Sequence, residues 1–106
     1  MIFCTFLCFG LGGCQRSVRL FVTNPYASPI VVYYKYWIDK TTFNYENEGT
    51  ALPHQSALLH GNCYYDADFY VLQFRQENGQ IIKEVTYSGE EVKKNTKEGI
   101  WHLTIP

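Results

Sequence analysis

The sequence has few of the features that are typical of membrane-spanning or nucleic-acid-binding proteins. Its longest uncharged apolar segment, residues 1–13, is shorter than the roughly 20 residues that a membrane-spanning helix needs. Neither sign of charge dominates, because 9 Lys and Arg residues stand against 10 Asp and Glu residues and leave a net charge of -1. Such a chain offers no basic surface for a phosphate backbone, so no nucleic acid partner is expected.

Recognisable catalytic motifs are missing as well. The sequence contains no Gly-x-Ser-x-Gly, no His-Glu-x-x-His and no glycine-rich phosphate loop. Ser56 or Cys63 could in principle pair with a histidine, but a small β domain has few deep clefts in which to hold a nucleophile and its base. We therefore expect neither catalysis nor a cofactor.

What the chain does contain is apolar and aromatic bulk. Hydrophobic residues make up 46% of its 106 residues, aromatic residues 17% and charged residues only 18%. This is too much apolar surface and too little charge for a disordered chain. The length is sufficient for one small domain.

The composition changes sharply near the beginning of the chain. Residues 1–13 are uncharged, and every charged residue lies at Arg16 or later. The length of this apolar run is typical of the central region of a secretory signal. It ends in Gly12 and Gly13, whose small side chains suit the cleft of a signal peptidase.

The four residues Leu11-Gly12-Gly13-Cys14 resemble the lipobox of bacterial lipoproteins. The resemblance implies that residues 1–13 are a signal peptide and that Cys14 receives a diacylglyceryl thioether. Residues 14–16 would then be a lipidated tether and residues 17–106 the folded domain. Because Gln15 is not the aspartate that retains many enterobacterial lipoproteins at the inner membrane, an outer-membrane location facing the periplasm is expected.

Other interpretations of this segment stay open. No Lys or Arg precedes the apolar run, so either the start codon lies upstream or the signal is unusual. Residues 1–13 could instead be a buried first element of a cytosolic domain or an uncleaved membrane anchor. If Cys14 is lipidated, Cys63 remains as a lone thiol, whereas cleavage without lipidation would allow Cys14 and Cys63 to pair.

From Ser17 onward, short β-prone runs alternate with turn residues, and no long stretch has helical spacing. About seven strands are predicted. They span residues 18–23, 30–38, 41–45, 56–60, 69–75, 80–87 and 99–105. A further short β-prone run lies at residues 50–52. Loops are predicted at 46–49 and around 61–68.

Two local motifs strengthen this assignment. Asn78-Gly79 between β-prone runs predicts a hairpin. Ser88 and Glu91 have the spacing of a capping box, which predicts one short helical turn near residues 89–94. The expected fold is an all-β, antiparallel two-sheet sandwich with an immunoglobulin-like layout. It is also similar in layout to small bacterial lipoproteins of unassigned function, on the basis of the turn residues 24–29 and 53–56.

The aromatic residues are the main candidates for a binding surface. Side chains alternate along a strand, so Tyr33 and Trp37 must face away from Tyr34 and Tyr36. If exposed, they would form a platform for sugar rings or a protein partner. The proposed platform residues are Tyr33, Trp37, Tyr64, Tyr65 and Trp101. The alternative is that both sets pack inside a small domain.

A metal site is a weaker hypothesis. His54, His60 and Cys63 lie close together in sequence, and imidazole with thiolate suits copper or zinc. Their spacing matches no standard ligand pattern, so we expect two surface histidines, a buried cysteine and no metal. The overall expectation is a lipid-anchored cell-envelope β-sandwich with a binding, scaffolding or structural role. A glycan-binding module and a small periplasmic metal-binding protein are the alternatives.

Overall fold

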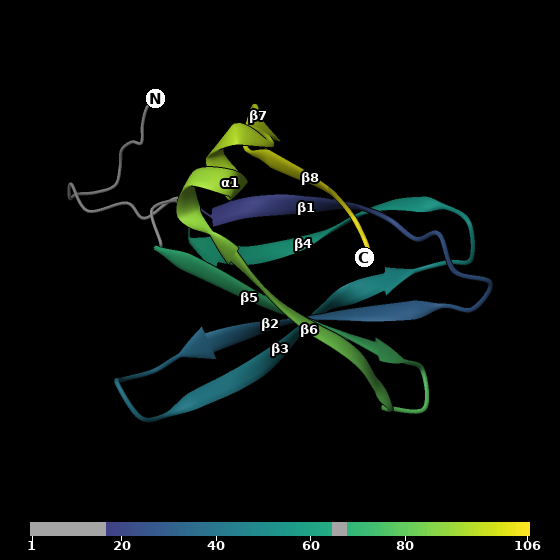
Figure 1. Cartoon of the computed structure of the whole chain (residues 1–106), viewed down its shortest axis with the longest axis horizontal. Coiled ribbons are helices and arrows are strands. Elements are labelled where there is room, and N and C mark those ends of the chain that lie inside the picture. Colours follow the sequence, from purple (N-terminus) through teal and green to yellow (C-terminus); the bar gives the residue numbers. More distant parts are fainter. Residues whose placement is uncertain (1–16, 65–67) are drawn as a thin grey trace.

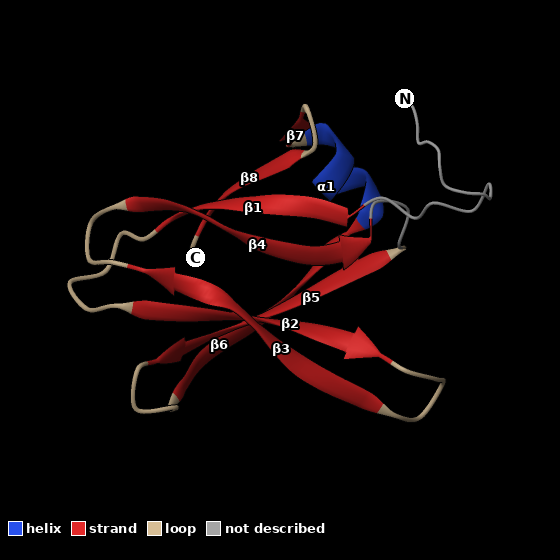
Figure 2. Cartoon of the chain, turned by 180° about the vertical axis from the view of Figure 1, so that it is seen from behind, coloured by secondary structure: helices blue, strands red, loops and turns tan. Residues whose placement is uncertain are grey.

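The computed structural model describes residues 17–64 and 68–106, which form two packed β-sheets and one short helix (Figures 1 and 2). The strands are β1 (Ser17–Thr23), β2 (Ile30–Trp37), β3 (Phe43–Ala51), β4 (Ser56–Tyr64), β5 (Phe69–Gln76), β6 (Ile81–Ser88), β7 (Thr96–Lys97) and β8 (Ile100–Thr104), and the helix is α1 (Gly89–Lys94). Within these described ranges, no helix has the length and apolar character needed to cross a bilayer.

The two sheets have four strands each. Their strand orders are β4-β1-β8-β7 and β3-β2-β5-β6. Every pairing is antiparallel except that of β1 with β8, which run parallel. The predicted all-β two-sheet sandwich is confirmed, with β2 in the interior of its sheet as its β-branched and aromatic sequence favours.

The core lies between the sheets and follows the alternation of side chains along each strand. In β1, Val18, Leu20 and Val22 are fully buried, whereas Arg19 is exposed. α1 contributes Val92 to the same cluster. The buried hydrophobic cluster consists of Val18, Leu20, Val22, Ile30, Val32, Tyr34, Ala51, Leu59, Tyr70, Leu72, Phe74, Val92, Trp101 and Ile105.

The predicted helical turn and the predicted hairpin are both present. α1 spans Gly89–Lys94, and the hydroxyl of Ser88 accepts a hydrogen bond from the Glu91 amide at 3.2 Å, as an N-cap does. β5 and β6 form the predicted hairpin, in which Gly79 adopts a φ of 92° that favours glycine.

The predicted loop at residues 46–49 is wrong, because β3 continues through it. Val32 pairs with Gly49 and Tyr33 pairs with Asn47, so Glu48 is an extra residue in a β-bulge. Gly49 has a φ of 134° there. The residues that suggest a loop therefore produce an irregularity within a strand.

Two further differences from prediction concern β4 and β7. β4 continues beyond His60 to Tyr64, because its second half pairs with the beginning of β1 after an irregularity in register. Strand β7 was not predicted at all. With only two residues, paired against Ile100 and Trp101, β7 is too short to show a periodic pattern.

Candidate functional site

The outer face of the second sheet carries a row of aromatic side chains from two neighbouring strands. Trp37 of β2 pairs with Phe43 of β3, and Lys35 pairs with Tyr45. Because side chains alternate, Tyr33, Lys35 and Trp37 share the face that points away from the core. The row combines rings and a cation on a surface whose opposite side is the hydrophobic core.

At the hairpin that joins β2 to β3, the row is open to solvent. Trp37 is 50% exposed, Ile38 55% and Phe43 40%. The rings of Trp37 and Phe43 meet edge to face, with centroids 5.1 Å apart. We call Trp37, Ile38 and Phe43 the apolar tip.

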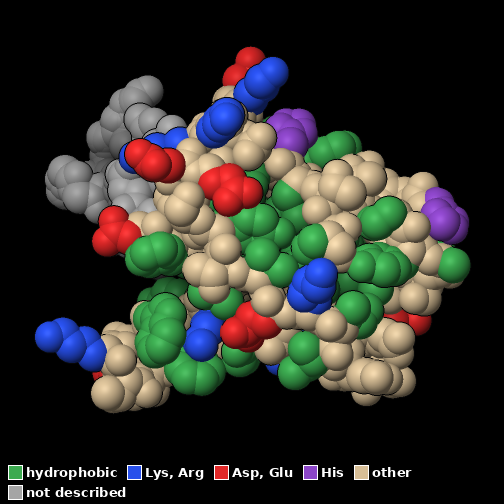
Figure 3. Space-filling view, viewed as in Figure 1, with side chains coloured by type: hydrophobic (Ala, Val, Ile, Leu, Met, Phe, Trp, Pro, Cys, Tyr) green, Lys and Arg blue, Asp and Glu red, His purple; other side chains and the backbone are tan. Residues whose placement is uncertain are grey.

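A lysine packs against the apolar tip. The Lys35 Nζ lies 4.2 Å from the Phe43 ring centroid and 4.8 Å from that of Trp37. A cation over an aromatic face is attracted by the electron-rich ring. Figure 3 shows apolar side chains with basic ones among them at the end of the molecule where β2 and β3 meet.

The turn that presents the apolar tip is held by a carboxylate. Asp39 Oδ1 accepts hydrogen bonds from the backbone N–H groups of Thr41 and Thr42, each at 2.9 Å. These bonds, with that of Thr41 the largest contribution, lower the pKa of Asp39 below its ordinary value. Ile38 also donates its N–H to the Thr42 carbonyl at 2.8 Å. The tip is thus supported by an ordered turn.

The other end of the row is closed by polar contacts. The Arg75 guanidinium lies 3.9 Å from the Tyr33 ring centroid and covers that ring. Tyr45 donates its hydroxyl to Glu84 at 2.7 Å, and the Gln73 amide donates to the same carboxylate oxygen at 3.0 Å. We call these five residues the polar network.

This polar network perturbs one ionisable group. The hydrogen bond to Glu84 raises the pKa of the Tyr45 phenol above its ordinary value, and burial adds to the effect. Gln73 is only 5% exposed although it lies on the outer face, because its neighbours cover it. The network therefore resembles packing more than an open binding site, which leaves the apolar tip as the accessible part of the row.

The predicted aromatic platform is present only in part. Tyr33 and Trp37 share one face as expected, but only Trp37 has an open ring. Trp101 is 1% exposed and packs between Tyr70 and Tyr87, with ring centroids 5.6 Å and 5.0 Å away. Its assignment to a surface platform is wrong, because the alternation in β8 directs Trp101 into the core.

Several other candidates lie outside the described part of the chain. Cys14 and Tyr65 fall there, as do the side chains of Cys63 and Tyr64. Sequence reasoning did not identify Phe43 as part of the site. Phe43 lay at alternate spacing with Tyr45 in a predicted strand, but only the pairing with β2 places it beside Trp37.

The histidines proposed as metal ligands are both exposed. His54 lies in the turn after β3 with a φ of 55°, and His60 lies in β4. Across residues 17–64 and 68–106, no group of three or more His, Cys, Asp and Glu side chains is placed to hold a metal ion.

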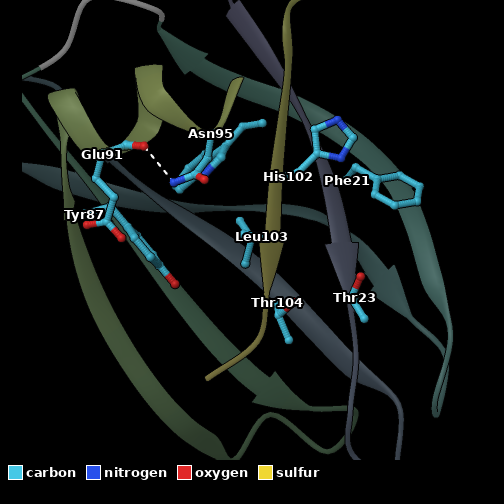
Figure 4. Close-up of a pocket in the computed structure, with 9 residues that line it drawn as sticks. Phe21, Thr23, Tyr87, Glu91, Asn95, His102, Leu103 and Thr104 are labelled. Atoms are coloured by element: carbon cyan, nitrogen blue, oxygen red, sulfur yellow. Dashed lines mark hydrogen bonds between the residues drawn. The ribbon is translucent and has the colours of Figure 1, made fainter. Parts of the chain in front are cut away.

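A pocket of about 400 Å³ opens beside β8 (Figure 4). Its lining consists of Phe21, Thr23, Tyr87, Glu91, Asn95, Trp101, His102, Leu103 and Thr104. Figure 4 shows His102 and Phe21 on one side of the β8 ribbon and Tyr87, Glu91 and Asn95 on the other. The imidazole of His102, which is the potential base, and the side chain of Glu91 thus lie on opposite sides of β8 in this view.

The contacts within this pocket are structural in character. His102 packs its ring against Phe21, with centroids 5.3 Å apart. Burial, followed by the charge of Glu91, raises the pKa of Tyr87 to about 12. A phenol with so high a pKa is a poor acid or base near neutral pH. We therefore regard the apolar tip as the better candidate site.

Comparison of the chain with protein families, curated proteins and solved structures finds no match.

Proposed function

We propose that this protein is a lipid-anchored β-sandwich of the bacterial cell envelope that acts by binding rather than by catalysis. In this proposal residues 1–13 are a removed signal, Cys14 carries the acyl chains, and the sandwich stands in the periplasm at the outer membrane. The apolar tip is its contact surface.

The observation that carries the binding role is the exposure of the apolar tip. Trp37, Ile38 and Phe43 are 40–55% exposed at one hairpin, whereas the second tryptophan, Trp101, is buried in the core. Exposed apolar side chains that cluster on an ordered element favour a contact surface. The Asp39 turn gives the tip a defined shape, which lowers the conformational entropy that binding would cost.

The lipobox-type sequence supports the anchor. Burial of each acyl methylene contributes about 0.8 kcal/mol, so one chain holds a protein only marginally and two or more hold it stably. Only Gln15 and Arg16 separate Cys14 from the first residue of β1. The sandwich would therefore stand close to the bilayer surface.

The anchor is tested by the mass of the mature protein from a bacterial host. Wild type is expected to carry acyl mass on an N-terminal Cys14 and to sediment with membranes. The variant Cys14→Ser is expected to lose both the acyl mass and the membrane association. A soluble wild-type chain that retains Met1 would refute the proposal.

Glycan binding is a second candidate, and the open rings of Trp37 and Phe43 favour it. Sugars stack on exposed aromatic faces, although these two rings meet edge to face, with 61° between their planes, and form no flat platform. Titration with soluble N-acetylglucosamine oligomers, followed by tryptophan fluorescence, tests it. A saturable change that Trp37→Phe abolishes would support glycan binding, and an unchanged emission would exclude these sugars.

A further inference from the structure

The apolar tip lies at the same end of the molecule as the beginning of β1, which follows the proposed anchor in sequence. Figures 1 and 2 show the β2–β3 hairpin, the beginning of β1 and the beginning of β5 at one end of the long axis. Among the described elements, the hairpin extends furthest in that direction. The β5–β6 hairpin and the β3–β4 turn lie at the opposite end.

The short tether limits how far this end can move from the membrane. Three Cα–Cα steps separate Cys14 from Ser17, which corresponds to about 10 Å of fully extended chain. The sandwich is 44 Å along its long axis. A lipidated Cys14 would therefore hold the beginning of β1 near the bilayer surface, and the projecting hairpin would be able to reach it.

Exposed apolar side chains are concentrated at this end. Among residues 17–64 and 68–106, seven large apolar side chains are exposed, and four of them lie here: the three of the apolar tip and Phe69 at the beginning of β5. Phe69 is 65% exposed, more than any of the other six. The anchored end is thus the more apolar end.

The chemistry of the hairpin is that of a membrane interface. Tryptophan prefers the headgroup level of a bilayer, where its ring is buried and its N–H remains hydrated. Lys40 is exposed in the turn, and Lys35 lies along the Trp37 and Phe43 rings. Lysines at this depth place their stems on apolar surface and their ammonium groups at lipid phosphates.

We propose that the apolar tip inserts into the interfacial layer of the same bilayer that holds the acyl chains. This inference rests on the lipid anchor proposed above, and it names the bilayer as the partner that the apolar tip contacts. The tether keeps the tip at high effective concentration relative to the bilayer, so weak insertion is sufficient. The inserted tip then fixes the orientation of the sandwich and turns the β5–β6 hairpin toward the periplasm.

The test uses the lipidated protein in phosphatidylethanolamine and phosphatidylglycerol vesicles whose acyl chains carry bromine near the carbonyl end. Bromine quenches tryptophan emission only at contact distance. Brominated lipid is expected to quench part of the wild-type emission. In Trp37→Phe, which retains only the buried Trp101, this quenching is expected to be lost.

A matched control moves the exposed tryptophan to the opposite end. Ile81 is 54% exposed in β6, much like Trp37 at 50%. The double variant Trp37→Phe/Ile81→Trp is expected to be quenched by aqueous acrylamide but not by brominated lipid. Unchanged Trp101 emission reports that Trp37→Phe is folded, and an unchanged far-ultraviolet circular dichroism spectrum reports the same for the double variant.

The possible outcomes separate the two proposals. Equal quenching of the Trp37 and Ile81→Trp probes, or no quenching of Trp37 by brominated lipid, would overturn the insertion. Shielding of Trp37 from acrylamide without lipid quenching would also overturn it and point to a second copy or another protein on the tip. All three results leave acylation intact, whereas a missing acyl mass on Cys14 refutes the anchor itself.

Discussion

Replacement of Asn24 is expected to destabilise the fold more than any other substitution we consider. Asn24 is fully buried after β1. Its Nδ2 donates to the backbone carbonyls of Ser28 at 2.9 Å, Ala51 at 3.0 Å and Leu52 at 3.2 Å, and its Oδ1 accepts from the Tyr26 amide at 2.8 Å. One side chain therefore links the β1–β2 connection to the end of β3.

The magnitude follows from the number of hydrogen bonds that this side chain can make. The Nδ2 group has two hydrogens for three carbonyls, so one hydrogen is shared, and with the bond accepted by Oδ1 the side chain makes about three full bonds. At about 1 kcal/mol net for each bond, Asn24→Ala is expected to lower the free energy of unfolding by ~3 kcal/mol. The bond to Ala51 is buried, so water cannot readily replace it. This is a large part of the roughly 5–15 kcal/mol that stabilises a typical domain.

The assay is urea unfolding followed by the fluorescence of buried Trp101. With an m-value of about 1–2 kcal/mol/M, the midpoint is expected to fall by ~1.5 M or more. Ser56→Ala is the matched control, because it removes one exposed hydroxyl contact to Thr23 nearby, and its effect is expected to be within about 0.5 kcal/mol.

Asn24→Asp separates hydrogen bonding from shape. It preserves the volume and the Oδ1 acceptor but places a carboxylate oxygen against three carbonyls, so at neutral pH we expect at least as large a loss as for alanine. Burial would raise the folded-state pKa of this new carboxyl above its unfolded value of about 3.9. Stability should therefore recover as pH falls through the folded pKa. Wild-type stability of the Asp variant at neutral pH would refute the reasoning.

Three further predictions concern the bulge, the helix and alkaline pH. Gly49→Ala would add a Cβ 2.9 Å from the Leu59 side chain at a φ of 134°, and it is expected to cost about 2 kcal/mol in the free energy of unfolding. Gly79→Ala, with a φ of 92° but open space, should cost about 1 kcal/mol, and equal losses would contradict the role of the close contact. Ser88→Ala removes the N-cap of α1 and should cost about 1 kcal/mol, most of which Ser88→Asn restores; no change on alanine substitution would rule out the cap. The folded-state pKa of Tyr87 is raised from 10.0 to about 12, so its neutral phenol stabilises the folded state below pH 10 and this contribution is lost as pH rises toward 12. Urea unfolding at stepped alkaline pH should show a smaller loss in Tyr87→Phe, and parallel curves would contradict this expectation.

The sequence by itself determined the elements whose signals are local. Alternation in β1 placed Val18, Leu20 and Val22 in the core, the Ser88 cap set the beginning of α1, and Asn78-Gly79 marked the β5–β6 hairpin. Each of these features depends on residues within a few positions of one another, so chain geometry is sufficient to predict it.

Only the tertiary structure decided which aromatic residues are accessible. The two faces of β2 are both aromatic, and packing against the other sheet selected Tyr34 for the core and left Trp37 exposed. Pairing with β3 brought Phe43 beside Trp37, and Arg75 from β5 covered Tyr33. The sequence of residues 46–49 predicts a loop because the same residue types occur in turns and in β-bulges. Pairing with β2 decides that these residues form a bulge within β3. Contacts between distant strands leave no periodic trace in either strand alone.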